Sequence, residues 1–182
     1  MQTRFDMKKT IEELKKILFD SGRATADHAV GLLLARPELL PGFRQLAFSD
    51  EYPFDMRASN VIEKADEKVP GFAASLIPDI VPSLTAFKND GPRRQFLRML
   101  VRYTPAIDED LTGVLYDACY GFACDQSQPV AVRHNAVMVL EALAVRYPEL
   151  KSEIVAALEL RIHEEHGPFG PWLRAFLAKM NA

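Results

Sequence analysis

Apolar residues recur at intervals of three and four along most of the chain, without the strict alternation that is typical of strands. This periodicity places apolar side chains along one side of a helix, so it predicts an all-α protein. The clearest pattern lies between Leu111 and Tyr147, where two helices are expected. The positions expected to be buried are Val114, Leu115, Ala118 and Cys119 in the first helix, and Val132, Ala136, Val137, Leu140 and Leu143 in the second. Neither helix could bury such a stripe alone, so neighbouring helices are expected to cover it.

Three kinds of residue recur in a fixed order between the apolar segments. A phenylalanine followed within three residues by an aspartate predicts a helix end and a polar turn. These pairs are Phe19 and Asp20, Phe48 and Asp50, Phe87 and Asp90, and Phe122 and Asp125. An arginine then opens the next segment, at Arg57, Arg93 (or Arg94), Arg133 and Arg174, with gaps of 36, 40 and 41 residues when Arg93 is taken. Prolines, which cannot continue a helix, follow at Pro37, Pro70, Pro105 and Pro148. The chain therefore contains a repeat of about 40 residues.

Two stretches resemble parts of a HEAT repeat. Residues Leu76 to Leu84, followed by the turn Lys88-Asn89-Asp90-Gly91-Pro92-Arg93, are similar to its first helix and Asp-containing turn. The segment Pro129-Val130-Ala131-Val132-Arg133, followed by Ala136, Leu140 and Leu143, resembles its second helix. The resemblance extends from about Leu39 to Tyr147, and the whole chain is similar to short bacterial HEAT-like proteins without established activity.

The resemblance implies an all-α fold, an α-α superhelix (HEAT-like solenoid) of about five helix pairs. Residues 1–182 are expected to form a single domain of this kind, because 182 residues are too few for two independent domains. In the HEAT family such superhelices serve mostly as binding scaffolds, with the second helices lining a groove. The resemblance therefore implies a non-enzymatic protein-interaction scaffold.

Composition is that of an ordinary folded protein, with 48% hydrophobic and 26% charged residues. The apolar runs are far shorter than the roughly 20 residues that cross a bilayer. The charged segment Met1 to Lys16 lacks the features of a secretory signal, so a cytoplasmic protein is expected. The two cysteines, Cys119 and Cys124, are expected to be reduced thiols.

Charge is unevenly distributed along the chain. The net charge of −3 disfavours a protein that mainly binds nucleic acid, although residues 57–102 hold eight Lys or Arg against five acidic residues. Within that basic region Arg94, Arg98 and Arg102 lie four apart and share a helix face. Arg102 is explained by its position near a helix end, where a cation interacts favourably with the last carbonyls. Arg94 and Arg98 are therefore the candidate residues for binding an acidic partner.

Sequence patterns of catalysis and metal binding are weak. The cluster His163-Glu164-Glu165-His166 places two histidines on one helix face, but it lacks further ligands and precedes Gly167, so an exposed helix end is expected instead of a metal site. No glycine-rich phosphate loop, G-x-S-x-G motif or zinc-ligand spacing occurs in the sequence. We therefore assign no catalytic residue, metal or cofactor, and expect that the protein is not an enzyme.

One alternative function comes from the same resemblance. Some HEAT-like proteins excise alkylated bases from DNA, which requires a basic concave track, aromatic side chains and a catalytic carboxylate. Here the one tryptophan, Trp172, follows Pro171 and is more simply interpreted as a cover over the end of the core. The first hypothesis is thus a scaffold for another protein or peptide, and the alternative is a nucleic-acid-binding HEAT-like protein related to alkylated-base DNA glycosylases. Convergence of the following cations on one surface would favour the alternative: Lys64, Lys68, Lys88, Arg94, Arg98 and Arg102.

Overall fold

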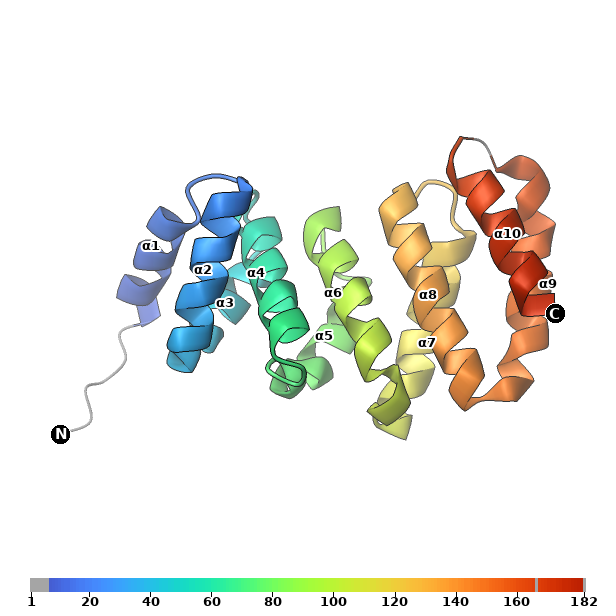
Figure 1. Ribbon diagram of the computed structural model, residues 1–182, viewed down its shortest axis with the longest axis horizontal. Helices are drawn as coiled ribbons and strands as arrows, with labels where there is room; N and C mark the ends of the chain where they lie inside the picture. The colour runs from blue at the N-terminus through green and yellow to red at the C-terminus, as the bar shows by residue number, and fades with distance from the viewer. Residues whose placement is uncertain (1–6, 166, 182) are drawn as a thin grey trace. The chain divides into compact units, whose positions relative to one another are not determined.

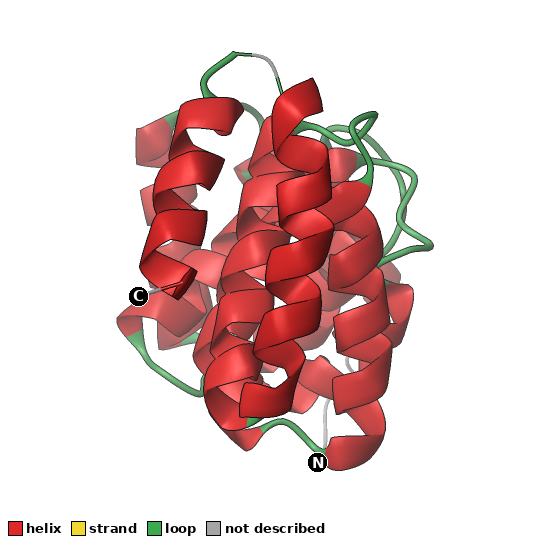
Figure 2. Cartoon of the chain, turned by 90° about the vertical axis from the view of Figure 1, so that its right-hand side faces the viewer, coloured by secondary structure: helices red, strands yellow, loops and turns green. Residues whose placement is uncertain are grey.

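The structure, a computed structural model, describes residues 7–165 and 167–181. Within these ranges the chain is helical and contains no strand, as Figure 2 shows. The predicted all-α fold is therefore confirmed. In chain order the α-helices are α1 (Met7–Ile17), α2 (Arg23–Ala35), α3 (Leu40–Ala47), α4 (Phe54–Lys68), α5 (Ile77–Ser83), α6 (Asp90–Tyr103), α7 (Glu109–Cys124), α8 (Val130–Arg146), α9 (Lys151–Arg161) and α10 (Phe169–Asn181).

The helices of the described residues form five consecutive pairs, each with a first and a second helix (Figure 1). The chain divides into two compact units, Met1–Met99 and Leu100–Ala182, and the boundary falls within α6. In the first unit α3 packs on α4, while α1 contacts α3 and α2 contacts α4. In the second unit α7 packs on α8, and α9 contacts both α7 and α10. First helices thus pack on first helices, and this stacking covers stripes that one pair could not bury.

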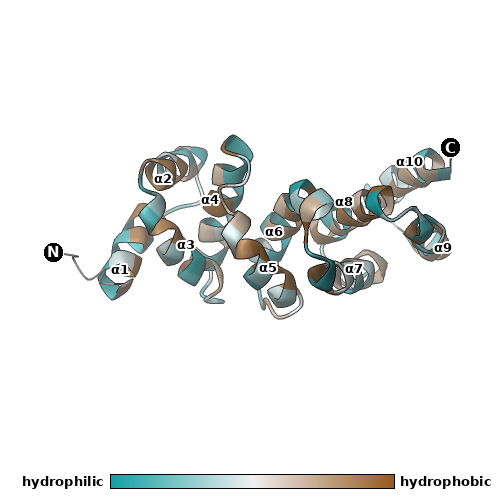
Figure 3. Ribbon diagram, turned by 90° about the horizontal axis from the view of Figure 1, so that it is seen from below, coloured by the Kyte–Doolittle hydropathy of each residue, from teal (hydrophilic) through white to brown (hydrophobic). Residues whose placement is uncertain are grey.

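Most of the positions expected to be buried form the core of the second unit. Leu115, Cys119 and Leu140 are at most 1% exposed, and Figure 3 shows apolar and polar residues sharing the helices. Val114 is the exception, because 44% of its surface remains exposed. It precedes Leu115 on the helix, so it lies about 100° around the axis, at the edge of the apolar stripe.

Arginines of the second helices bind carbonyls at the ends of earlier first helices. Arg57 donates to the carbonyl of Leu18 at 2.8 Å, and Arg93 donates to that of Leu84 at 3.1 Å. Arg133 donates to the carbonyl of Ala123 near the end of α7. The last carbonyls of a helix have no partner within the helix, so each arginine satisfies a buried or half-buried acceptor. This recurring capping explains the spacing of Arg57, Arg93 and Arg133, whereas Arg174 is exposed within α10.

Short 3₁₀ turns follow several second helices at the predicted proline positions. Pro37–Leu39 follows α2 and Pro148–Leu150 follows α8, and both turns have the sequence Pro-Glu-Leu. Thr104–Ala106, which contains Pro105, follows α6. Arg146 binds the Ile107 carbonyl just after this turn at 2.7 Å, so it ties α8 to the preceding repeat.

Candidate partner-binding site

A cleft of about 290 Å³ lies in the first unit, beside the first turns of α2, α4 and α6. Its walls come from the end of α1, the α1–α2 turn and these three helices. Arg94, one of the two candidate residues, belongs to the wall formed by α6. The lining residues are Leu18, Asp20, Ser21, Thr25, Ala26, Met56, Arg57, Asn60, Val61, Arg94 and Gln95.

Two carboxamides line this cleft. Gln95 on α6 is only 7% exposed, and Asn60 on α4 is half-buried. Neither side chain forms a hydrogen bond with any residue that the structure describes. Because they line the cleft without a partner among the described residues, these carboxamides can bind a group that enters it.

Three charged side chains complete the cleft. Arg57 is held in place, because its Nε donates to Ser21 Oγ at 3.1 Å in addition to its bond with the Leu18 carbonyl. Hydrogen bonds from the Thr25 side chain and from the Gly22 backbone N–H lower the pKa of Asp20, so its carboxylate stays ionised near neutral pH. Arg94 is exposed. Two cations thus face one anion.

Arg98, the second candidate residue, lies one turn after Arg94 on α6 and forms an ion pair with Glu63 of α4. Its Nε donates to Glu63 Oε1 at 3.0 Å, and its Nη2 donates to Oε2. Glu63 is completely buried, whereas 48% of the Arg98 side chain is exposed. The hydrogen bond to Glu63 raises the pKa of Arg98. Arg94 and Arg98 therefore share a helix face, but Arg98 also neutralises a buried carboxylate.

A buried polar stripe on α4 was not anticipated from the sequence. Asp55, Ser59, Glu63 and Asp66 are each at most 1% exposed and are spaced four, four and three residues apart. Asp66 accepts a hydrogen bond from the backbone N–H of Ala73 at 3.0 Å. The spacing of these residues places them on one helix face, but acidic residues at such positions are ordinarily exposed to solvent.

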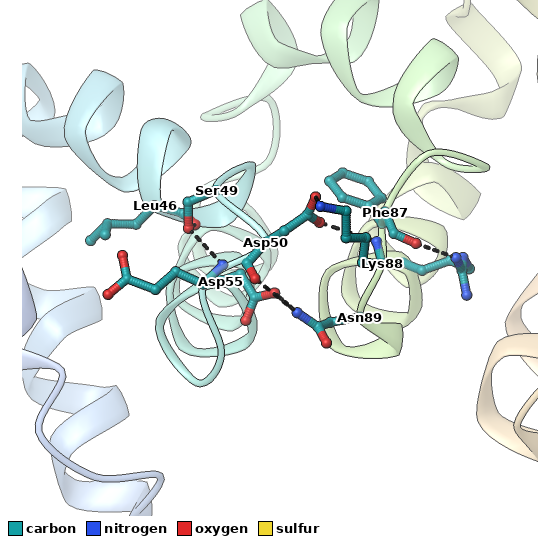
Figure 4. Close-up of polar contacts among 9 residues, drawn as sticks. Leu46, Ser49, Asp50, Asp55, Phe87, Lys88 and Asn89 are labelled. Atoms are coloured by element: carbon teal, nitrogen blue, oxygen red, sulfur yellow. Dashed lines mark hydrogen bonds and ion pairs between the residues drawn. The ribbon is translucent and has the colours of Figure 1, made fainter.

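The α3–α4 and α5–α6 turns are joined by a polar network (Figure 4). The Asp50 carboxylate accepts a hydrogen bond from the Lys88 backbone N–H at 3.1 Å. Asn89 Nδ2 donates to the Asp50 carbonyl at 3.3 Å and to the carboxylate of buried Asp55 at 2.6 Å. Asp50 has a positive φ of 56°, which an aspartate tolerates better than most residues. The network fixes consecutive repeats against each other and satisfies Asp55.

Several basic side chains of the central region are paired with acids. Lys64 lies 3.9 Å from Asp27, and Lys88 Nζ lies 3.7 Å from Asp50. Lys68 is near the C-terminal end of α4, whereas Lys88 precedes the start of α6. Much of the positive charge that a nucleic-acid surface would need is therefore balanced locally.

Residues with metal or redox chemistry are not assembled into a site. Within residues 7–165 and 167–181, no group of three His, Cys, Asp or Glu side chains could hold a metal ion. His163 is exposed, and its proposed companion His166 lies outside the described residues. Burial raises the pKa of the Cys119 thiol, and burial also raises that of Cys124. Both effects disfavour a reactive thiolate.

Trp172 belongs to an aromatic cluster of the second unit. Its ring centroid lies 4.3 Å from that of His134 on α8, 5.4 Å from Phe169 and 5.5 Å from Phe176. The tryptophan is half-buried and packs α10 against α8. This packing agrees with a structural role for Trp172.

The stacked helix pairs and their capping arginines define an all-α helical-repeat protein. The comparison with known families is more specific, because the family model of the HEAT repeat domain matches residues 24–168. The chain therefore belongs to the HEAT repeat family. Neither the curated proteins nor the solved structures contain a match to it. No helix in the described part of the chain is long and apolar enough to cross a membrane.

Proposed function

We propose that this protein is a non-enzymatic scaffold that binds an acidic segment of another protein, with Arg94 and Arg98 on the binding surface. HEAT repeats commonly mediate protein interactions, and this chain belongs to that family. The observation that supports this surface is the exposed Arg94 on the wall of a cleft whose carboxamides have no partner among the described residues. Arginine is enriched at the residues that dominate protein interfaces.

Arg98 has two roles in this proposal. It neutralises Glu63, and the exposed half of its side chain adds positive charge beside Arg94. The positive charge of Arg98 is enough to attract an acidic segment over a distance. Direct contact with that segment is assigned to Arg94. The ion pairs of Lys64 and Lys88 favour this function over the nucleic-acid alternative, because they reduce the positive charge available for phosphates.

Affinity capture from the source cell tests the proposal. The intact protein, Arg94→Glu and the matched control Arg174→Glu serve as bait, since both arginines are exposed and both variants change the net charge equally. We expect a protein captured by the intact chain and by Arg174→Glu but lost with Arg94→Glu. Its capture should weaken as salt rises, because exposed charges are screened beyond about 8 Å at physiological ionic strength. Equal capture by Arg94→Glu at every salt concentration, or capture abolished by nuclease, would contradict the proposal.

A further inference from the structure

We infer that the cleft of the first unit receives a glutamate side chain from an acidic peptide segment. This inference rests on the proposed function, because the segment would belong to the partner that Arg94 binds. It deepens that function by assigning a pocket, a ligand group and the side chains that recognise it.

The size and floor of the cleft suit a single acidic side chain. Its volume of about 290 Å³ is just below the roughly 300–1,000 Å³ of small-molecule sites. Leu18 and Val61, each 1% exposed, and the neighbouring Ala26 and Met56 supply apolar surface. The aliphatic stem of a glutamate would pack on this surface and carry its carboxylate to the polar wall.

The polar wall offers donors that match a carboxylate. Gln95 is more than nine-tenths buried, lines the cleft and has no hydrogen-bond partner in the part of the chain that the structure describes. Asn60 provides a second such carboxamide from the neighbouring helix α4. The amide N–H groups of both can donate to carboxylate oxygens of a group that enters the cleft.

The net charge of the lining favours a singly charged anion. Arg57 and Arg94 contribute two positive charges, and Asp20 contributes one negative charge. The resulting charge of +1 matches one carboxylate. A phosphate group, with a charge of about −1.5 to −2 at neutral pH, would exceed the positive charge of the lining.

An exposed aromatic residue between two lining residues of the sequence supports a peptide as the source of the carboxylate. Phe19 is 69% exposed and lies between Leu18 and Asp20, which both line the cleft. A free dicarboxylate bound in the cleft has only a short methylene chain, and it carries no further apolar group for this ring to contact. A peptide with an apolar residue next to its glutamate can bind the cleft and the ring together, in the aromatic and arginine combination of interface hot spots.

Nuclear magnetic resonance on the ¹⁵N-labelled intact chain tests this inference, because the side-chain NH₂ groups of Asn60 and Gln95 give their own signals. The probes are a capped peptide with one glutamate between leucines, the same peptide with glutamine, and free glutarate. We expect the glutamate peptide to shift both signals in a saturable way, and to bind about ten times more tightly than the glutamine peptide, as loss of a charge-assisted contact implies. Absence of saturable shifts with the glutamate peptide would overturn the inference.

Variants identify the groups that make the contact. Arg94→Met should weaken peptide binding about tenfold, whereas Arg174→Met should leave it unchanged. Gln95→Met keeps the buried volume and should also weaken binding of the peptide. Asn60→Ala, at a less buried position, should weaken it as well. Phe19→Ala should weaken binding of the peptide but not of glutarate. If glutarate and the peptide bind equally tightly and Phe19→Ala changes neither affinity, a peptide is not the source of the carboxylate.

The two proposals fail in different ways. If Arg94→Glu abolishes capture of a protein partner but the glutamate peptide leaves the Asn60 and Gln95 signals unchanged, the scaffold function stands and the glutamate pocket is wrong. If the peptide binds the cleft but capture of protein partners does not depend on Arg94, the pocket stands and the proposed function is wrong.

Discussion

Replacement of Arg98 by methionine should destabilise the protein although the residue is half exposed. The change removes two hydrogen bonds from the guanidinium to Glu63, which is completely buried on α4. Hydrogen bonds to charged groups contribute about 1.5–3 kcal/mol each, and solvent screening at the exposed side of Arg98 reduces this value. We therefore expect a loss of about 2 kcal/mol, which corresponds to a fall in Tm of about 4–8 °C for a chain of this size.

Urea and thermal unfolding followed by circular dichroism measure this effect. Arg174→Met is the matched control, since it removes the same charge from an exposed position and should change stability by less than about 0.5 kcal/mol. Combining Arg98→Met with Glu63→Gln should recover about half of the loss, because a neutral amide is less costly to bury than a carboxylate without its cation. Equal stability of Arg98→Met and Arg174→Met would refute a structural role for the ion pair.

Two further predictions concern the second unit. Leu140→Ala should destabilise the protein by about 2–5 kcal/mol, because Leu140 is 1% exposed and its truncation leaves a cavity. Val145→Ala is the control and should have little effect, because this position is 80% exposed. Equal losses of stability for the two variants in urea unfolding would place Leu140 outside the core. The second prediction concerns Tyr116, whose pKa is raised to about 12 by burial of the hydroxyl and by the nearby Glu153 carboxylate. Because the pKa of Tyr116 in the folded chain exceeds the usual value of about 10, the stability linked to its protonated hydroxyl is complete below pH 10. This stability is lost as pH rises towards 12. A tyrosinate absorbance titration should show one late group that disappears in Tyr116→Phe, and unchanged curves would contradict this environment.

The fold could be predicted from the sequence because its determinants are local. Apolar spacing, Phe-to-Asp turns and proline exits each act within a few residues, and they recur often enough to reveal the repeat. The capping arginines were visible as a spacing, but not their acceptors. Arg57 reaches the Leu18 carbonyl 39 residues earlier, so its partner depends on how consecutive pairs stack.

The candidate site was only partly predictable. Arg94 and Arg98 could be placed on one face from their spacing, but the sequence made them equivalent, whereas the structure pairs Arg98 with Glu63. That pairing joins residues 35 apart on different helices, and charged residues at helical spacing ordinarily indicate a solvated face. Gln95 carried no signal, because an uncharged amide in an amphipathic helix does not reveal whether neighbouring helices bury it.

Photo-cross-linking tests most directly whether an acidic partner binds the first unit at the Arg94 cleft. Replacing Phe19 with p-benzoylphenylalanine keeps an exposed aromatic group between the lining residues Leu18 and Asp20, and the same substitution at Val145, which is 80% exposed on α8, is the control. Irradiation in the source cell should join a protein through position 19 but not through position 145, with the cross-link falling near acidic residues of that protein and disappearing in the Arg94→Glu background. Cross-links that form equally at position 145, or that persist at position 19 with Arg94→Glu, would contradict this assignment of the binding surface.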